Sequence, residues 1–163
     1  MGTKNGYQFI WKEATAKVKA GVAQFTYLNG DRFYTISSLV KDSANVFLTR
    51  VGANDPSFNL RREPAYIIRT QAVNPVFVNV IEMHGKYDTR NEFSTDAYSS
   101  VKNIELVQQD ENYTVARIQL NEKTFLIVLC NKDYVAGSKH QLQIGNTNYE
   151  WTGPYLFKAS NNK

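Results

Sequence analysis

Residues 22–36 read VAQFTYLNGDRFYTI, in which apolar and polar side chains alternate on both sides of the pair Asn29 and Gly30. Alternation with a period of two is typical of β-strands, because successive side chains point to opposite faces of a sheet. Asn and Gly both tolerate the positive φ that a tight type I′ turn requires. We therefore predict a β-hairpin here, within an antiparallel sheet.

Similar strand-like segments continue along the rest of the chain. Residues 121–123 and 145–147 read as hairpin turns, and the four prolines lie at proposed strand boundaries. The one helix-like patch, residues 13–20, is too short for a stable helix and is interpreted as a strand pair or irregular edge. The further strand candidates are residues 45–51, 65–71, 76–84, 99–108, 113–120, 124–130, 141–144 and 148–151.

About ten short strands without a long helical pattern predict an all-β fold, an antiparallel β-sandwich with little or no helix. The chain has 163 residues and 42% hydrophobic content, enough for a packed core. We expect one domain over residues 7–158, between tails at residues 1–6 and 159–163. No apolar run approaches the roughly 20 residues needed to cross a bilayer, so no membrane span is predicted.

Charge and cysteine content narrow the function classes. The net charge is +4, from 19 basic and 15 acidic side chains spread along the chain. Nucleic-acid binding normally requires clustered Lys and Arg, so no nucleic-acid partner is expected. Cys130 is the only cysteine, which excludes an internal disulfide, and its apolar neighbours predict a buried thiol.

A turn rich in Gly, Asn, Asp and Pro, at residues 52–59, lies between two strand-like runs and next to several arginines. Guanidinium groups bind carboxylates through paired hydrogen bonds, so Arg61 and Arg62 are candidates for holding a uronic-acid polymer. Asp55 belongs to the same turn. The alternative is structural, since Arg62 beside Glu63, or either arginine with Asp55, would pin the turn through an ion pair.

Glu82 and His84 are two residues apart near the end of an apolar strand, so both side chains should emerge on one face. Such a pair can act as an acid and a base, or supply two ligands of a metal ion. Further ligands would have to come from Asp88, Glu92, Asp96 or His140. Because the spacing matches no ligand motif, we predict no metal site, and a structural role for His84 is favoured.

Aromatic side chains could form a sugar-stacking platform. Trp151 and Tyr155 flank a Gly-Pro turn and are the candidates for exposed rings. The alternative is that most aromatic residues fill the core of the sandwich. Phosphate loops, Cys-x-x-Cys pairs and nucleophile elbows are missing, and the chain has two histidines, so no catalytic residue is predicted.

Three segments together carry a family resemblance: RVGANDPSFNLRREP at residues 50–64, VIEMHGKY at residues 80–87 with Glu92 beyond it, and WTGPY at residues 151–155. They resemble the C-terminal part of alginate lyases of polysaccharide lyase family seventeen, within the heparinase II/III-like superfamily. The likeness spans most of residues 25–155. It departs from the expected pattern at Met83, where a proline would precede His-Gly.

This resemblance implies a longer enzyme, with an α/α toroid joined to β-sheet domains, that cleaves uronic-acid chains by β-elimination. In that reaction a base removes the C5 proton of a uronate, whose carboxylate is neutralised while an acid assists the leaving oxygen. The resemblance places the neutralising Asn/His pair, the catalytic tyrosine and the ligands of a structural zinc in the toroid and central sheet. No cofactor is therefore expected on this chain.

The expected function is that of an accessory C-terminal β-sandwich, inactive alone, which supports the catalytic toroid. Its partners would be the missing catalytic and central domains and an acidic polysaccharide, and the resemblance implies a periplasmic or extracellular location. The residues expected at the rim of the cleft are Asp55, Arg61, Arg62, His84 and Glu92. The alternatives are an autonomous carbohydrate-binding module for acidic glycans, or the equivalent domain of a heparin or heparan-sulfate lyase.

Overall fold

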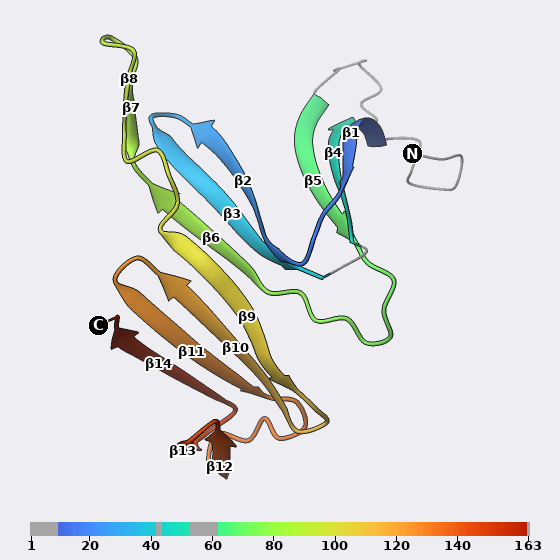
Figure 1. Ribbon diagram of the computed structural model, residues 1–163, viewed down its shortest axis with the longest axis vertical. Helices are drawn as coiled ribbons and strands as arrows, with labels where there is room; N and C mark the ends of the chain where they lie inside the picture. Colours follow the sequence, from blue (N-terminus) through green and yellow to red (C-terminus); the bar gives the residue numbers. More distant parts are fainter. Residues whose placement is uncertain (1–9, 42–43, 53–61, 163) are drawn as a thin grey trace. The chain divides into compact units, whose positions relative to one another are not determined.

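The computed structural model describes residues 10–41, 44–52 and 62–162, which form antiparallel β-sheets (Figure 1). These residues contain no helix, so the predicted all-β fold class is confirmed. Consequently, no helix long and apolar enough to cross a membrane occurs in this described part of the chain. The strands are β1 (Ile10–Lys17), β2 (Gly21–Asn29), β3 (Arg32–Val40), β4 (Asn45–Gly52), β5 (Arg62–Arg69), β6 (Asn79–His84), β7 (Lys86–Asp88), β8 (Phe93–Thr95), β9 (Val101–Gln109), β10 (Tyr113–Leu120), β11 (Lys123–Cys130), β12 (Lys139–Ile144), β13 (Thr147–Thr152) and β14 (Tyr155–Asn161).

The chain divides into two compact units. The first comprises residues 1–25 and 39–77, and the second comprises residues 26–38 and 78–163. The division falls within β2 and β3, each of which contributes residues to both units. At the C-terminal end, β14 continues to Asn161, beyond the domain end expected at residue 158. Residues 1–6 lie outside the described part.

The first unit contains a three-stranded sheet in the order β1-β4-β5. The patch at residues 13–20 falls largely in β1, which pairs with β4 across a register shift between Lys12 and Ala14. Pro64 lies inside β5 rather than at a strand boundary, so the prediction for this proline is wrong. β5 is an edge strand, where a missing N–H need not break a hydrogen-bonded ladder.

The second unit contains the predicted Asn-Gly hairpin, which is confirmed. β2 and β3 are neighbours in one sheet, and Gly30 between them has a φ of 63°. β6 pairs with the other edge of β3, so the sheet has the order β2-β3-β6. β7 and β8 form a short hairpin directly after β6, which was not among the predicted strands.

The core of the second unit lies between a four-stranded sheet, ordered β14-β11-β10-β9, and the β12–β13 hairpin. Val115 and Val128 are fully buried on the sheet, and Ile144 joins them from the hairpin. Their partly buried neighbours include Leu142, Tyr149 and Trp151 of the same hairpin. This two-layer packing agrees with the sandwich-like arrangement that the alternation predicts.

Candidate functional site

The Glu82 carboxylate at the end of β6 is held by two serines that precede β9. Ser99 Oγ and Ser100 Oγ each donate to it at 2.5 Å, and the backbone N–H of Ser100 donates at 3.0 Å. Burial raises the pKa of Glu82, but the hydrogen bonds from Ser100 and Ser99 outweigh this effect and bring the pKa below its ordinary value. The carboxylate is therefore an ionised anchor and a poor proton acceptor.

His84 shares a face of β6 with Glu82, as predicted, and both of its ring nitrogens are hydrogen-bonded. Nδ1 lies 2.8 Å from the carbonyl oxygen of Asp96, which can only accept, so Nδ1 carries the proton. Nε2 lies 2.8 Å from Thr35 Oγ1, which in turn contacts Thr26 Oγ1 at 2.7 Å. The ring also stacks on Phe33 at a centroid distance of 6.1 Å. This network favours the structural interpretation of His84 over an acid–base role.

Arg50 on β4 and Arg69 on β5 each contact a side chain of their own sheet. Arg50 Nε donates to Glu13 Oε1 at 2.5 Å across the β1–β4 pair. The Arg69 guanidinium lies 5.7 Å from the centroid of the Phe47 ring. Asp55 and Arg61 lie outside the described residues, as does the Arg62 side chain, so their proposed rim role stays a prediction.

Glu92 belongs to the exposed turn between β7 and β8, where its φ is 50°. Asp88 organises this turn by accepting hydrogen bonds from the N–H groups of Arg90 and Asn91. The carboxylate of Glu92 is thus displayed on a tight, well-built turn. That position is compatible with a rim role, which stays a prediction.

Trp151 of β13 lies in an aromatic cluster instead of forming an open platform. Its ring stacks on His140 of β12 at a centroid distance of 5.2 Å and meets Tyr113 of β10 edge-on at 5.7 Å. Its indole N–H donates to the carbonyl of Gly153 at 3.1 Å. These contacts favour the core alternative for Trp151.

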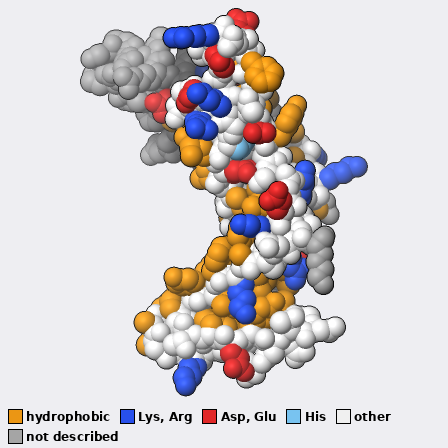
Figure 2. Space-filling view, turned by 90° about the vertical axis from the view of Figure 1, so that its left-hand side faces the viewer, with side chains coloured by type: hydrophobic (Ala, Val, Ile, Leu, Met, Phe, Trp, Pro, Cys, Tyr) orange, Lys and Arg blue, Asp and Glu red, His pale blue; other side chains and the backbone are white. Residues whose placement is uncertain are grey.

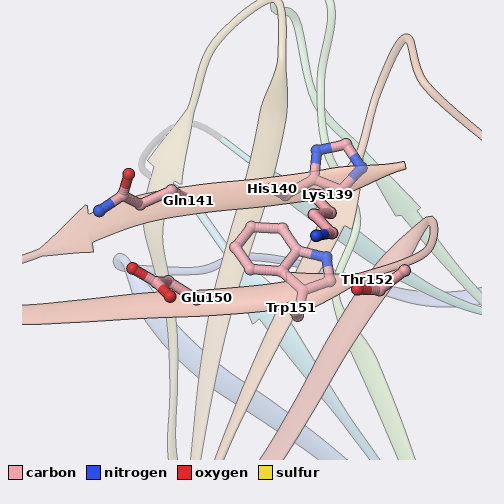
Figure 3. A pocket seen from close by; sticks show the side chains of 6 residues that line it. All are labelled: Lys139, His140, Gln141, Glu150, Trp151 and Thr152. Carbon is pink, nitrogen blue, oxygen red and sulfur yellow. The ribbon is translucent and has the colours of Figure 1, made fainter. Parts of the chain in front are cut away.

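A shallow groove of about 570 Å³ lies along the β12–β13 hairpin (Figure 3). Neighbouring strands place Gln141 opposite Glu150, and Lys139 opposite Thr152. One cation, one carboxylate and two neutral polar groups can bind hydroxyl groups but do not converge on a reacting atom. The lining residues are Lys139, His140, Gln141, Glu150, Trp151 and Thr152.

His140 is the most buried titratable group beside this groove, with 7% of its side chain exposed. Its Nδ1 lies 3.3 Å from the Tyr113 hydroxyl, whereas Nε2 is buried without a hydrogen-bond partner in the structure as described. Asp133 Oδ2 is 3.9 Å from Nε2, close enough for an ion pair if the ring is protonated. The sequence did not predict the association of Tyr113, His140 and Asp133, because no local spacing signal connects residues from three segments.

Tyr155 behaves differently from Trp151. It begins β14 and is 62% exposed, on the strand that pairs with β11. Of the two candidate rings, Tyr155 is therefore the exposed one. Its stacking role in glycan binding stays a prediction.

The next features are the possible metal ligands and the single thiol of the described residues. Among the residues that the structure describes, no group of three or more His, Cys, Asp and Glu side chains is placed to hold a metal ion. Burial raises the pKa of the Cys130 thiol, which is 3% exposed. Cys130 is thus the buried, unreactive residue that its apolar neighbours predict.

Fold and side-chain geometry together define an all-β chain in which hydrogen bonds tie the Glu82 and His84 side chains of β6 to neighbouring segments. The chain is 33% identical over 157 residues to an exo-oligoalginate lyase of Saccharophagus degradans, a match that covers 94% of this chain and 21% of that protein. It is 32% identical to an alginate lyase of Stenotrophomonas maltophilia, over 95% of this chain and 21% of that protein. No family model matches the chain.

These matches confirm the resemblance to alginate lyases. The chain spans about a fifth of the length of the curated relatives that it matches. It therefore aligns with one part of each of these longer proteins. Its place in the wider heparinase II/III-like superfamily stays a prediction.

Proposed function

We propose that this chain is the C-terminal accessory β-domain of an oligoalginate-degrading lyase, inactive alone, and that it supports the catalytic domains of the longer protein. The observation that carries the proposal is the coverage of the two matches. Nearly all of this chain aligns with about a fifth of two proteins named as alginate lyases.

The hydrogen bonding supports an accessory role. β-Elimination requires a base that can accept a proton and a group that neutralises the substrate carboxylate. Glu82 is stabilised as an anion by two serines, and His84 is hydrogen-bonded at both ring nitrogens. Both side chains therefore support a structural framework better than they support proton transfer.

Three parts of the proposal rest on resemblance. The first is that Asp55, Arg61, Arg62, His84 and Glu92 contribute to the rim of the substrate cleft. The second is that a structural zinc of the longer protein is bound by another domain. The third is a periplasmic or extracellular location.

The proposal is tested by incubating the 163-residue chain with oligoalginate and following the absorbance of the unsaturated uronate that β-elimination produces. The chain alone should give no turnover above buffer, whereas the full-length polypeptide that carries it should give turnover. Activity of the isolated chain would exclude the accessory role. Inactivity of the full-length polypeptide on oligoalginate would exclude the lyase assignment.

A carbohydrate-binding module is the second candidate, and the exposed ring of Tyr155 is the observation in its favour. Saturable binding of alginate oligosaccharides to the isolated chain, lost on Tyr155→Ala, would support this candidate. Trp151→Ala is a poor probe of it, because the ring belongs to the core cluster.

A further inference from the structure

Strand β11 carries apolar side chains on both of its faces. Its sequence, KTFLIVLC, is a nearly continuous apolar run, whereas a strand with one solvated face should alternate. Leu126 and Val128 face the β12–β13 hairpin and are 7% and 0% exposed. Phe125, Ile127 and Leu129, which alternate with them along the strand, must therefore lie on the opposite face of the sheet.

That opposite face is covered over only part of its area. On β10, Ala116 and Ile118 are each 7% exposed. They lie directly opposite Ile127 and Phe125 of β11. Farther along the same face, Leu129 is 49% exposed. This face of the sheet is therefore buried over the middle of β10 and becomes exposed toward β11 and β14.

The apolar side chains of β11 and β14 on this side of the sheet form what we call the β11–β14 face, in which Leu129, Tyr155 and Phe157 are exposed and the other members are half-buried. Strand pairing places Ile127 opposite Phe157 and Leu129 opposite Tyr155. Phe157 is 56% exposed and stacks on Phe125 at a centroid distance of 5.4 Å. In Figure 2, hydrophobic side chains gather in the lower part of the view, over the side on which Figure 1 places β14. The face consists of Phe125, Ile127, Leu129, Tyr155 and Phe157.

The chemistry of the β11–β14 face suits a protein surface better than a glycan. Sugars require hydrogen-bonding groups around the stacking ring. Here the Tyr155 hydroxyl is the only polar group among the five side chains. Nearby Thr114 already donates its hydroxyl hydrogen to Asn131 Oδ1 at 3.0 Å. Contiguous exposed apolar surface of this kind typically marks a protein interface.

We propose that the β11–β14 face docks against another domain of the same lyase polypeptide, an inference that rests on the function proposed above. The occupant is a domain in cis because the curated relatives contain about four fifths of their length outside the matched part. Docking would bury the second face of β11, as its continuous apolar sequence requires. A second copy of this chain is the competing occupant.

Hydroxyl-radical footprinting compares the isolated 163-residue chain with the full-length polypeptide. We expect Leu129, Tyr155 and Phe157 to be labelled several-fold less in the full-length polypeptide. Phe93 on β8 is the internal reference, since it is 63% exposed and lies outside the face. Equal labelling of the face in both proteins would overturn the proposal.

Two matched variants test whether protection from labelling depends on the β11–β14 face. Phe157→Ser should lower the unfolding temperature of the full-length polypeptide and restore the labelling of Leu129 and Tyr155, whereas Phe93→Ser should do neither. In the isolated chain, circular dichroism should show that both variants remain folded, because both rings are largely exposed. A Phe157→Ser full-length protein that still protects Leu129 and Tyr155 would contradict the proposal.

The oligomeric state distinguishes a second copy from a domain in cis. Docking in cis would be overturned if the isolated chain forms a dimer that Phe157→Ser dissociates, and if labelling of the face is the same in the full-length polypeptide as in the isolated chain. Protection of the face in a full-length polypeptide that leaves oligoalginate intact would support docking and reject the lyase function. The two proposals therefore fail separately.

Discussion

Glu82 illustrates how a residue that suggests catalysis can be structural. A carboxylate two positions from a histidine suits an acid–base pair, and the two side chains do share a face of β6. Yet the strongest partners of Glu82 are Ser99 and Ser100, which lie 17 and 18 residues farther along the chain. The function of the carboxylate is to connect β6 to the start of β9.

Replacing Glu82 by Gln should destabilise the chain by about 1 to 2 kcal/mol at neutral pH, because charge-assisted hydrogen bonds from two serines weaken. The pKa of Glu82 is lowered in the folded chain, so its stabilisation is complete above the unfolded-state pKa and is lost as the pH falls through the folded-state pKa. The difference between wild type and variant should therefore shrink in acid. Urea unfolding at several pH values measures it.

Glu92→Gln is the matched control for this experiment, since Glu92 lies in the exposed β7–β8 turn. This variant should change the free energy of unfolding by less than about 0.5 kcal/mol. A Glu82→Gln effect that is equally large at all pH values would show that the carboxylate acts through packing rather than charge.

At the scale of elements, Gly85 controls how β6 passes into the β7–β8 hairpin. Its φ is +53°, and a Cβ at this position would overlap the backbone carbonyl oxygens of Thr95 and Asp96. The same junction is tied to the β2–β3 turn, because Arg32 donates to the Gly85 carbonyl at 3.1 Å and Tyr87 donates to that of Asp31 at 2.8 Å. A side chain would disturb both connections.

Gly85→Ala should destabilise the chain by more than the 1 to 2 kcal/mol or so that a left-handed backbone conformation costs a non-glycine residue. Gly145→Ala is the control, because Gly145 has a φ of +59° but no atom within 4 Å of the added Cβ. The Gly145→Ala variant should lose only the free energy of unfolding that corresponds to the left-handed backbone conformation. Thermal unfolding compares the two, and equal losses would exclude the overlap at Gly85.

The sequence predicted elements where the signal was local. The Asn-Gly hairpin and the paired strands β10 and β11 follow from alternation, apolar runs and turn residues in adjacent segments. Strand β14 was missed, because no strand was predicted beyond residue 151 and residues 159–163 look like a polar tail. Its residues 155–161 pair with β11, and the Asn162 amide donates to the Leu120 carbonyl at 2.8 Å.

At the scale of the whole molecule, the buried side chains are distributed unevenly between the two units. Among the residues that the structure describes, most of the buried hydrophobic ones belong to the second unit, including Val115, Val128 and Ile104. Strand β1 of the first unit is exposed along almost its entire length. The local free energy of opening should therefore differ between the units.

Hydrogen exchange followed by mass spectrometry should detect this difference. Amide protons in β10 and β11 should exchange roughly tenfold or more slowly than those in β1, because opening the core of the second unit exposes more apolar surface. Equal protection of β1 and β10 would show that the two units open as one cooperative body.

By itself, the sequence determined the all-β class, its main hairpins, the burial of Cys130 and the relation to alginate lyases, because alternation, turn residues and family segments are local. Tertiary structure alone decided that Trp151 joins the core while Tyr155 remains exposed, and which partners hold Glu82 and His84. The reason is physical: burial and hydrogen bonding depend on partners from distant strands, and those partners are fixed when the sheets pair and pack.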